Sequence, residues 1–386
     1  MRSVIKNARI VTRDEVLSGF DLSIKDGRIE QIEKMINDAE EVIDAEGAWL
    51  IPGFVDLHCH GGGGYEFMDA DVDEIGRIAD FHLKHGTTTM LATTLASEDG
   101  ELCYALDNLT KYLDANKGGS IVGIHLEGPW LNSAQCGAQN PDCIRSYKDG
   151  DIVKLVKRYP KIMRVSAAPE VEGGEKIADD ARALGIVTSI AHTDTDFKGI
   201  ERAISHGYSL VTHLYSGMKG FWRENSYRIA GAIEGALHFD ELAVELIADG
   251  CHLPDELLRF VYKIKGDERI CLVTDAIRAA GMPDGSKTKI GSLASGLDVV
   301  VEGGVAKLPN RKSFAGSAAT FDRVYRTMAR ATGGDMVSLS RMASDTPARI
   351  MGFTDRGRIA AGMRADLILM NDDLEIQKII IGGNIL

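Results

Sequence analysis

The segment Gly53-Phe54-Val55-Asp56-Leu57-His58-Cys59-His60 decides how the rest of the chain is interpreted. Its apolar run is typical of a buried strand, and four glycines follow it directly. Because residues i and i+2 of an extended chain point to the same side, His58 and His60 present two imidazoles to one point. Imidazole is the commonest protein ligand for metals. Such a pair also arises by chance, so the residues at the other strand ends must show whether His58 and His60 belong to a metal site.

Short apolar segments alternate with amphipathic helical patterns through the middle of the chain, which is typical of a parallel α/β sheet. Eight alternating units predict a (β/α)8 TIM-like barrel, for which roughly 250 residues are typical. A doubly wound open sheet is the competing topology. The candidate strands are 54–57, 87–92, 121–126, 164–168, 186–190, 210–212, 243–247 and 270–274.

Both ends of the chain are instead rich in β patterns. Residues 1–52 contain short alternating strands and the hairpin signal Asp26-Gly27, and residues 357–386 contain further apolar runs. We therefore expect a small β-sandwich domain built from 1–52 and 357–386, and a catalytic barrel over 53–356. Residues 276–320, which are rich in glycine, are expected to form a partly β excursion above the barrel.

The composition narrows the classes of partner. The 386 residues are 44% hydrophobic and 26% charged, as in ordinary globular proteins. A net charge of -13 argues against nucleic acid or an anionic membrane, although a local field can still favour a small anion. No apolar run predicts a membrane span or a signal peptide. Six scattered cysteines without Cys-x-x-Cys are typical of free thiols, and we expect a cytoplasmic location.

Histidines and carboxylates end several of the predicted strands. Taken singly, each histidine can be a hydrogen-bonding residue and each carboxylate a helix cap. The carboxyl ends of barrel strands, however, converge on one mouth, so only a shared site explains their joint placement. These residues are His58 and His60 on the first strand, Glu127 on the third, His192 on the fifth, His213 on the sixth, His252 beyond the seventh and Asp275 on the eighth.

Four histidines with Glu127 form a nitrogen-rich ligand set, which suits zinc or another divalent transition ion such as iron rather than calcium or magnesium. Such an ion lowers the pKa of bound water. Asp275 is not needed as a ligand, so it is the candidate general acid and base.

These residues resemble the amidohydrolase superfamily and, more closely, its N-acetylglucosamine-6-phosphate deacetylase family. The resemblance covers nearly the whole chain and includes 52–61, His125-Leu126-Glu127-Gly128-Pro129, 191–193, 212–215, 249–252 and 274–276. It implies deacetylation of N-acetylglucosamine 6-phosphate to glucosamine 6-phosphate and acetate. It also implies that one metal is held by Glu127, His192 and His213, with His58 and His60 supporting a second.

The same resemblance implies substrate contacts. His252 and Arg223 would bind the sugar phosphate, with Arg223 reaching across a homodimer. The chain departs from the family pattern at Gln139 and at Ser216-Gly217, and the segment around Arg223 is shifted by one residue. Gln139 can donate a hydrogen bond but cannot carry a charge. The remaining implied contacts are the backbone of Phe314, Ala315 and Gly316, Ala138-Gln139 where the family has Ala-His, and Ser216-Gly217 where it has Asn-Ala.

Two alternatives remain open. The altered pocket can accept another N-acylated sugar phosphate, such as N-acetylgalactosamine 6-phosphate, or a cyclic amide. The fold can also serve as an inactive scaffold, but such descendants generally lose ligands and none is lost here. Hydrolysis of an N-acyl group is therefore a firmer expectation than the identity of the sugar.

Overall fold

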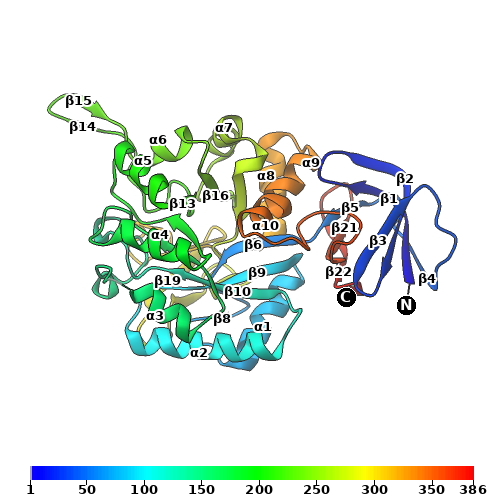
Figure 1. Cartoon of the computed structure of the whole chain (residues 1–386), viewed down its shortest axis with the longest axis horizontal. Coiled ribbons are helices and arrows are strands. Elements are labelled where there is room, and N and C mark those ends of the chain that lie inside the picture. Colours follow the sequence, from blue (N-terminus) through cyan, green and yellow to red (C-terminus); the bar gives the residue numbers. More distant parts are fainter. Residues whose placement is uncertain (1, 149) are drawn as a thin grey trace.

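The computed structural model describes residues 2–148 and 150–386. A barrel covered by helices and a smaller sheet lie side by side, and both chain ends lie at the sheet (Figure 1). This arrangement confirms the predicted fold class. The distribution of strands between the two parts supports a division into 1–52 with 357–386 and 53–356, which we propose as the domains.

The barrel has eight parallel strands, and neighbouring strands follow one another in chain order. Its first and last strands meet where the Asp275 N–H donates to the His58 carbonyl oxygen at 2.9 Å, which rules out an open doubly wound sheet. Each predicted strand overlaps one observed strand. These are β6 (Phe54–Cys59), β9 (Thr87–Thr94), β10 (Ile121–Glu127), β11 (Ile162–Ala167), β12 (Val187–Ile190), β13 (Tyr208–Val211), β16 (Ala243–Ile247) and β17 (Ile270–Val273).

Amphipathic helices pack around these strands. The first begins at a capping box between Asp71 and Glu74 and buries Ile75, Ile78 and Ala79 on one face. The helices are α1 (Val72–Leu83), α2 (Asp99–Ala115), α3 (Asp151–Arg158), α4 (Gly174–Ala183), α5 (Phe197–His206), α6 (Ala232–His238), α7 (Asp255–Lys265), α8 (Phe321–Thr332), α9 (Met336–Ser340) and α10 (Thr346–Ile350). A π-helical turn (Arg341–Asp345) joins the last two, and short 3-10 turns span Ser133–Gln135, Pro141–Cys143 and Asp267–Arg269.

The smaller sheet interleaves strands from both ends of the chain. Its β5 lies between β1, to which it is parallel, and β21, to which it is antiparallel. The sheet curls round a core that includes Ile5, Leu22 and Leu367, and the Ile29 N–H donates to the Met363 carbonyl oxygen at 2.8 Å. Its strands are β1 (Arg2–Val11), β2 (Val16–Lys25), β3 (Arg28–Glu33), β4 (Glu41–Asp44), β5 (Trp49–Pro52), β21 (Leu367–Met370), β22 (Ile376–Ile381) and β23 (Asn384–Ile385).

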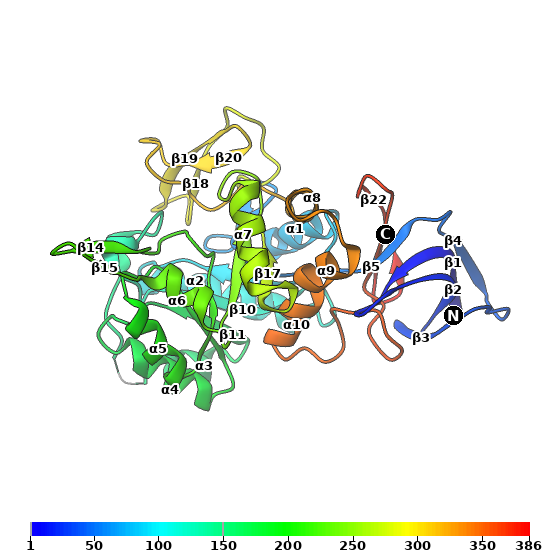
Figure 2. The ribbon, with the colours of Figure 1, turned by 90° about the horizontal axis from the view of Figure 1, so that it is seen from above.

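Three short strand groups extend the barrel's loops. The predicted excursion forms an antiparallel sheet beside the barrel (Figure 2), and the buried Arg278 ties it to Asp69 at 2.8 Å. A hairpin of β14 and β15 projects away from the helices (Figure 1). No helix in the described ranges is both long and apolar enough to cross a bilayer. The groups are β7 (Gly61–Gly62) with β8 (Tyr65–Glu66), β14 (Trp222–Glu224) with β15 (Tyr227–Ile229), and β18 (Lys287–Ile290) with β19 (Leu297–Glu302) and β20 (Val305–Lys307).

Candidate metal centre and catalytic cavity

The site residues lie at the carboxyl ends of the barrel strands. Glu127 is the last residue of β10, whereas His192, His213 and Asp275 stand just beyond β12, β13 and β17. The φ angles of these three are 45°, 29° and 48°, in a region that residues with a Cβ rarely adopt. Such strain persists only where the surrounding structure enforces it, and it clusters at functional sites. The sharp turn after each strand brings the side chain to the barrel mouth.

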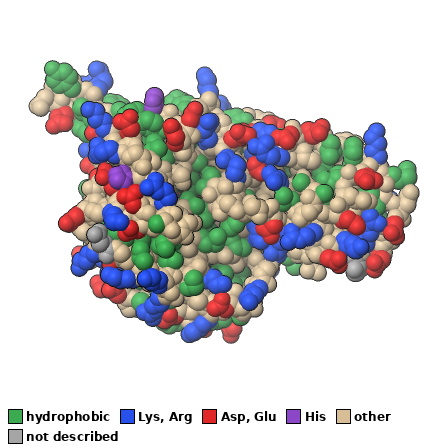
Figure 3. Space-filling model, viewed as in Figure 1, with side chains coloured by type: hydrophobic (Ala, Val, Ile, Leu, Met, Phe, Trp, Pro, Cys, Tyr) green, Lys and Arg blue, Asp and Glu red, His purple; other side chains and the backbone are tan. Residues whose placement is uncertain are grey.

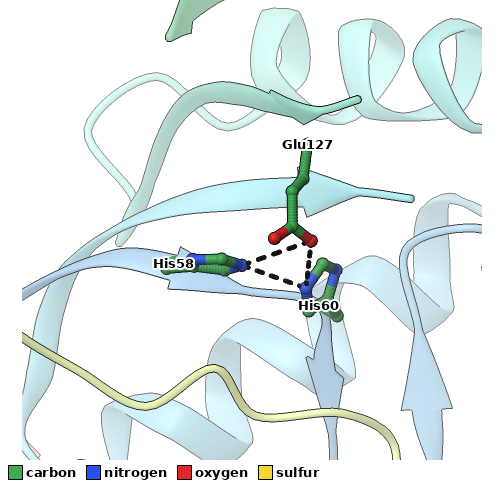
Figure 4. Close-up of side chains that lie close together, drawn as sticks. All are labelled: His58, His60 and Glu127. Atoms are coloured by element: carbon green, nitrogen blue, oxygen red, sulfur yellow. Dashed lines mark hydrogen bonds and ion pairs between the residues drawn. The ribbon is translucent and has the colours of Figure 1, made fainter. Parts of the chain in front are cut away.

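His58, His60 and Glu127 form the first of two buried triads (Figure 4). The Nε2 atoms of the two histidines are 3.1 Å apart. Glu127 Oε2 lies 3.6 Å from His58 Nε2 and 3.3 Å from His60 Nε2. The i and i+2 spacing on β6 therefore brings both imidazoles to one point, as the sequence predicts.

The second triad uses the other oxygen of the same carboxylate. Glu127 Oε1 lies 2.9 Å from His213 Nε2 and 3.3 Å from His192 Nε2. One carboxylate thus faces two pairs of imidazoles, one pair on each oxygen. This arrangement is suited to a bridging ligand between two cations.

The hydrogen-bond partner of Nδ1 in each imidazole ring determines whether Nε2 is available to bind a metal. His60 Nδ1 lies 3.2 Å from the carbonyl oxygen of Thr93, and His192 Nδ1 lies 2.8 Å from that of Gln135. A carbonyl oxygen only accepts, so both Nδ1 atoms carry a hydrogen, and in the neutral form of each ring Nε2 keeps the lone pair. His58 Nδ1 faces the Glu245 carboxylate at 3.3 Å in the same way. Histidine ligands of metals are held by such partners.

These features fit a divalent metal. Two Nε2 lone pairs only 3.1 Å apart repel each other unless a proton or a cation lies between them. His213 Nδ1 is buried and has no hydrogen-bond partner among the described residues, so the ring is held by its Nε2 contact with Glu127 and by packing against His58 and His192. A donor set of imidazole nitrogens and one carboxylate suits zinc and related transition ions.

The charges of the site are strongly coupled. Burial alone would lower the pKa of His58, but Glu127 and Asp275 outweigh it and raise that pKa well above its ordinary value. Against the same effect of burial, hydrogen bonds to Asp275 and Glu127 raise the pKa of His60 to about 9. Burial opposes ionisation of Glu127 and Asp275, yet the neighbouring imidazoles lower the pKa of both carboxyl groups. A bound cation would replace the proton and keep both carboxylates ionised.

A buried ion pair supports the centre from inside the barrel. The guanidinium of Arg164 on β11 contacts the carboxylate of Glu245 on β16, and both side chains are fully buried. Arg164 also donates to the Leu57 carbonyl oxygen and to the hydroxyls of Ser189 and Thr212, each at 3.0 Å. The network fixes Glu245, which in turn holds His58.

A cavity of about 530 Å³ opens above the two triads. His252 lies at its rim, where its Nδ1 is 2.9 Å from Asp249 Oδ2 and its ring packs on Phe314 with centroids 4.6 Å apart. The expected substrate residues that line the cavity are Ala138, Gln139, Ser216, Gly217, His252, Phe314 and Gly316, together with Asp275. The structure places the others apart: Ala315 is buried behind the wall, and Arg223 lies on the projecting β14–β15 hairpin.

The structure gives Gln139 a contact that sequence reasoning did not anticipate. Its Nε2 donates to Glu127 Oε2 at 2.7 Å, and its Oε1 accepts from the Ala96 N–H at 2.8 Å. Gln139 is only 3% exposed. The Gln139 amide therefore holds the carboxylate that would be shared by two metal ions.

Three cationic residues at the rim were also missed. Lys307, Arg311 and Lys312 line the cavity, and Lys307 pairs with Phe314, on which the His252 ring packs. They lie within the glycine-rich excursion. The sequence of that segment does not distinguish a charged residue at the barrel mouth from one on the ordinary protein surface. Their position just before Phe314 in the sequence was the available signal.

Comparisons with known proteins agree with this geometry. The sequence profile described as "Amidohydrolase family" matches residues 49–386. The chain belongs to the amidohydrolase family. It is 32% identical over 389 residues to N-acetylglucosamine-6-phosphate deacetylase of Lysinibacillus sphaericus, covering 99% of this chain and 97% of that protein. It therefore belongs to the N-acetylglucosamine-6-phosphate deacetylase family within the amidohydrolases, as the sequence motifs indicate.

Two further proteins are similar to this chain over nearly its full length. The chain is 29% identical to N-acetylgalactosamine-6-phosphate deacetylase of Escherichia coli O157:H7, covering 100% of this chain and 99% of that one. A solved structure of a variant N-acetyl-D-glucosamine-6-phosphate deacetylase from Mycobacterium smegmatis, in complex with N-acetyl-D-glucosamine-6-phosphate, superposes with a TM-score of 0.91 at 31% identity. It covers 100% of this amidohydrolase and 99% of that chain.

Proposed function

We propose that this amidohydrolase removes the acetyl group from N-acetylglucosamine 6-phosphate and releases glucosamine 6-phosphate and acetate. The observation that carries the proposal is Glu127 shared between two histidine pairs, with Asp275 against the Nε2 atoms of His58 and His60. Zinc is the proposed metal, with iron or another transition ion as the alternative. We propose two ions, one for each triad.

Asp275 is the proposed proton carrier. A divalent cation bound here would lower the pKa of a water molecule and polarise the amide carbonyl of the substrate. Asp275 Oδ1 lies 3.2 Å from His60 Nε2 and 3.4 Å from His58 Nε2, so its carboxylate stands directly beside the metal ligands. Because its pKa is lowered, Asp275 is ionised and can accept the proton of the attacking water. It then gives that proton to the leaving nitrogen.

A phosphorylated substrate fits the rim of the cavity. The chain carries a net charge of -13, yet Lys307 and Lys312 line this cavity together with His252, whereas Arg311 is paired with Glu302. An anionic group bound there is held by local cations within an acidic protein. We propose that His252, Lys307 and Lys312 receive the phosphate, while the backbone near Ser216, Gly217 and Gly316 contacts the sugar.

We also propose a homodimer that supplies Arg223. The β14–β15 hairpin projects from the barrel, and Figure 3 shows hydrophobic side chains at the tip of that projection. Phe221 is 64% exposed and Tyr227 is 76% exposed. An arm with exposed aromatic residues and Arg223 is suited to reach the cavity of a second copy.

N-Acetylgalactosamine 6-phosphate is the second candidate substrate. It is favoured by the departures at Gln139 and at Ser216-Gly217, which lie in the lining of the cavity. The galactosamine and glucosamine forms differ at one hydroxyl, so the residues that face the sugar ring decide between them.

Acetate release from a panel of phosphorylated and unphosphorylated N-acetylated sugars tests the proposal. We expect turnover after reconstitution with zinc and a strong preference for the 6-phosphates. Elemental analysis should find about two ions in each chain, in line with two-metal hydrolases. Absence of acetate release from every sugar, with metal bound, would reject the deacetylase and favour an inactive scaffold.

The Asp275→Asn variant tests the acid–base assignment. It keeps the shape of the side chain but removes its basicity, so we expect kcat to fall by about 10²–10⁴-fold. Metal content should stay close to that of the wild type. Wild-type turnover by this variant with metal bound would show that another group carries the proton.

A further inference from the structure

A second cavity, of about 520 Å³, lies directly behind the catalytic one. The two share a wall made of Leu95, Ala138, Gln139 and Ile290, which line both cavities. Three of these four side chains are apolar, and that of Ala138 is a single methyl group. We call the space beyond this wall the annex, and its other lining residues include Met68, Ser97, Glu98, Glu101, Asp142 and Leu297.

The order of the strands places the annex opposite the phosphate side. His252 follows β16, whereas Leu95 follows β9 and Gln139 follows Glu127 of β10. In the barrel order β17-β16-β13-β12-β11-β10-β9-β6, strands β16 and β10 stand four positions apart in a ring of eight, on opposite sides. The two triads lie between these sides. A substrate with its phosphate at His252 and its amide at Glu127 therefore directs the acyl substituent toward the shared wall.

The chemistry of the annex changes along its length. Next to the wall, Met68 and Leu95 present apolar surface and are 2% and 7% exposed. Ser97 is also 7% exposed, and its Oγ has no hydrogen-bond partner. Burial of a hydroxyl without a partner is costly, so this oxygen is suited to receive a polar atom of a ligand. The carboxylates of Glu98 and Asp142 stand at the exposed end, where they repel an anion.

We propose that the annex is an acyl subsite and that this deacetylase accepts uncharged N-acyl groups longer than acetyl. This inference rests on the proposed function, because it assumes that the amide carbonyl lies at Glu127. The acyl chain extends past Ala138 into the apolar part of the annex, and a terminal hydroxyl pairs with Ser97. Hydrolysis follows the same balance as for acetate: water adds across the amide bond to give the amine and the longer carboxylic acid.

Glucosamine 6-phosphate carrying acetyl, propionyl, butyryl, glycolyl or succinyl on its nitrogen provides the test. A closed acyl pocket discriminates by about 10–200-fold for each methylene. If the annex receives the acyl chain, kcat/KM for the propionyl and butyryl substrates should stay within about 10-fold of that for acetyl. A closed pocket predicts instead a loss of about 10–200-fold for each added methylene. Glycolyl should match propionyl or exceed it, and the anionic succinyl group should be cleaved at least about 100-fold less efficiently than butyryl, since an unpaired charge is poorly accommodated.

Variants of Ser97 locate the effect. Ser97→Leu fills the annex, so we expect the butyryl-to-acetyl ratio of kcat/KM to fall at least about 10-fold. Ser97→Ala is the matched control: it leaves the space open, keeps the butyryl ratio and loses only the advantage of glycolyl over propionyl. Leu297→Ala enlarges the annex and should raise the butyryl ratio, which keeps the test available if Ser97→Leu fails to fold.

The outcomes separate the two proposals. Turnover of acetyl with a loss of more than about 10-fold for propionyl would overturn the acyl subsite and leave the deacetylase intact, because a loss of that size is expected for a closed pocket. An unchanged butyryl ratio in both Ser97→Leu and Leu297→Ala would also overturn it. Failure of all five substrates with metal bound would overturn both.

Discussion

Gln139 shows how one side chain sets the geometry of the centre. Its amide group joins the Ala96 backbone to the bridging carboxylate of Glu127, and it is buried between the catalytic cavity and the annex. An amide can hold Glu127 by donation and cannot compete for the metal as an imidazole can. The departure from the family pattern therefore changes a support of the metal site as well as the substrate wall.

Gln139→Leu keeps the bulk of the side chain and removes both hydrogen bonds. Partners that orient metal ligands typically contribute 10–100-fold to affinity, so we expect metal binding to weaken by about that factor. Competition with a chelator measures the change directly, and Gln139→Glu serves as a control that retains an acceptor for Ala96. A raised KM with unchanged metal affinity would instead assign Gln139 to substrate contact alone.

The sequence assigned residues to the site only where the geometry of the backbone brings them together. His58, His60, Glu127, His192, His213 and Asp275 were placed together because parallel strands end at one mouth. The contacts of Gln139 with Ala96 and Glu127 span 43 and 12 residues, and no local pattern encodes them. The cations Lys307 and Lys312 were missed for the same reason, since their position depends on how the excursion folds back.

At the scale of elements, Arg164 ties the interior of the barrel together. From β11 it reaches β6, β12 and β16 and the Thr212 hydroxyl beyond β13, so one guanidinium satisfies polar groups on four neighbouring segments. Burial opposes ionisation of Glu245, but Arg164 lowers the pKa of its carboxyl group to about 2. The pair is therefore ionised at neutral pH.

Arg164→Met should destabilise the protein because it leaves the Glu245 carboxylate buried and uncompensated. Removal of one partner of a buried pair typically costs about 3–5 kcal/mol in the free energy of unfolding. Denaturant unfolding of the metal-free protein measures this loss. Arg164→Met with Glu245→Leu should recover part of it, whereas an equal or larger loss in the double variant would contradict the account.

Helix α1 carries a second buried titratable group, His82. Burial lowers its pKa to about 4, and its Nε2 lies 2.9 Å from the Gly61 carbonyl oxygen, to which it donates. The unfolded chain binds the proton near pH 6.5. Stability from neutral His82 is thus present above pH 6.5 and is lost as the pH falls toward 4.

His82→Gln removes this titration and keeps a donor for Gly61. At about 1.4 kcal/mol per pH unit, the wild type should lose about 2 kcal/mol more than the variant between pH 7 and pH 5. Urea midpoints of the metal-free proteins at both pH values provide the comparison. Parallel losses would show that His82 does not contribute to acid sensitivity.

Element types were largely predictable because period-2 and period-3.6 patterns are strong in this chain. Helix α6 has a weak helical pattern because Gly235 lowers its helix propensity, and glycine is required there because a Cβ would lie 2.8 Å from Ile200. The β14–β15 hairpin was missed, because its exposed Phe221 and Tyr227 follow no amphipathic alternation.

For the whole molecule, the projecting hairpin predicts self-association. Phe221→Ser with Tyr227→Ser removes the exposed aromatic surface, so we expect a dimer in the wild type and a shift toward monomer in the variant. Sedimentation velocity at several concentrations measures this shift. A monomeric variant should also show a raised KM for the sugar phosphate if Arg223 acts across the interface. A monomeric wild type would reject the arrangement.

The interleaved sheet was predictable in outline because both ends of the chain share the same alternation. The register of this sheet could not be predicted, because the two neighbours of β5 come from before and after the barrel in the sequence: β1 precedes the barrel and β21 follows it. The hydrogen bond from the Gly53 N–H to the Asp366 carbonyl oxygen joins these distant segments at 2.8 Å.

Because the sheet combines strands from both ends of the chain, it can be completed only late in translation. Strand β5 leaves the ribosome early, but its partner β21 follows only after the whole barrel has been translated. At about 5–20 residues per second, one edge of β5 stays unpaired for roughly 15–60 s. An open edge can pair with other chains, so association of newly made chains through β5 is favoured during this interval. Completion of the sheet closes that interval.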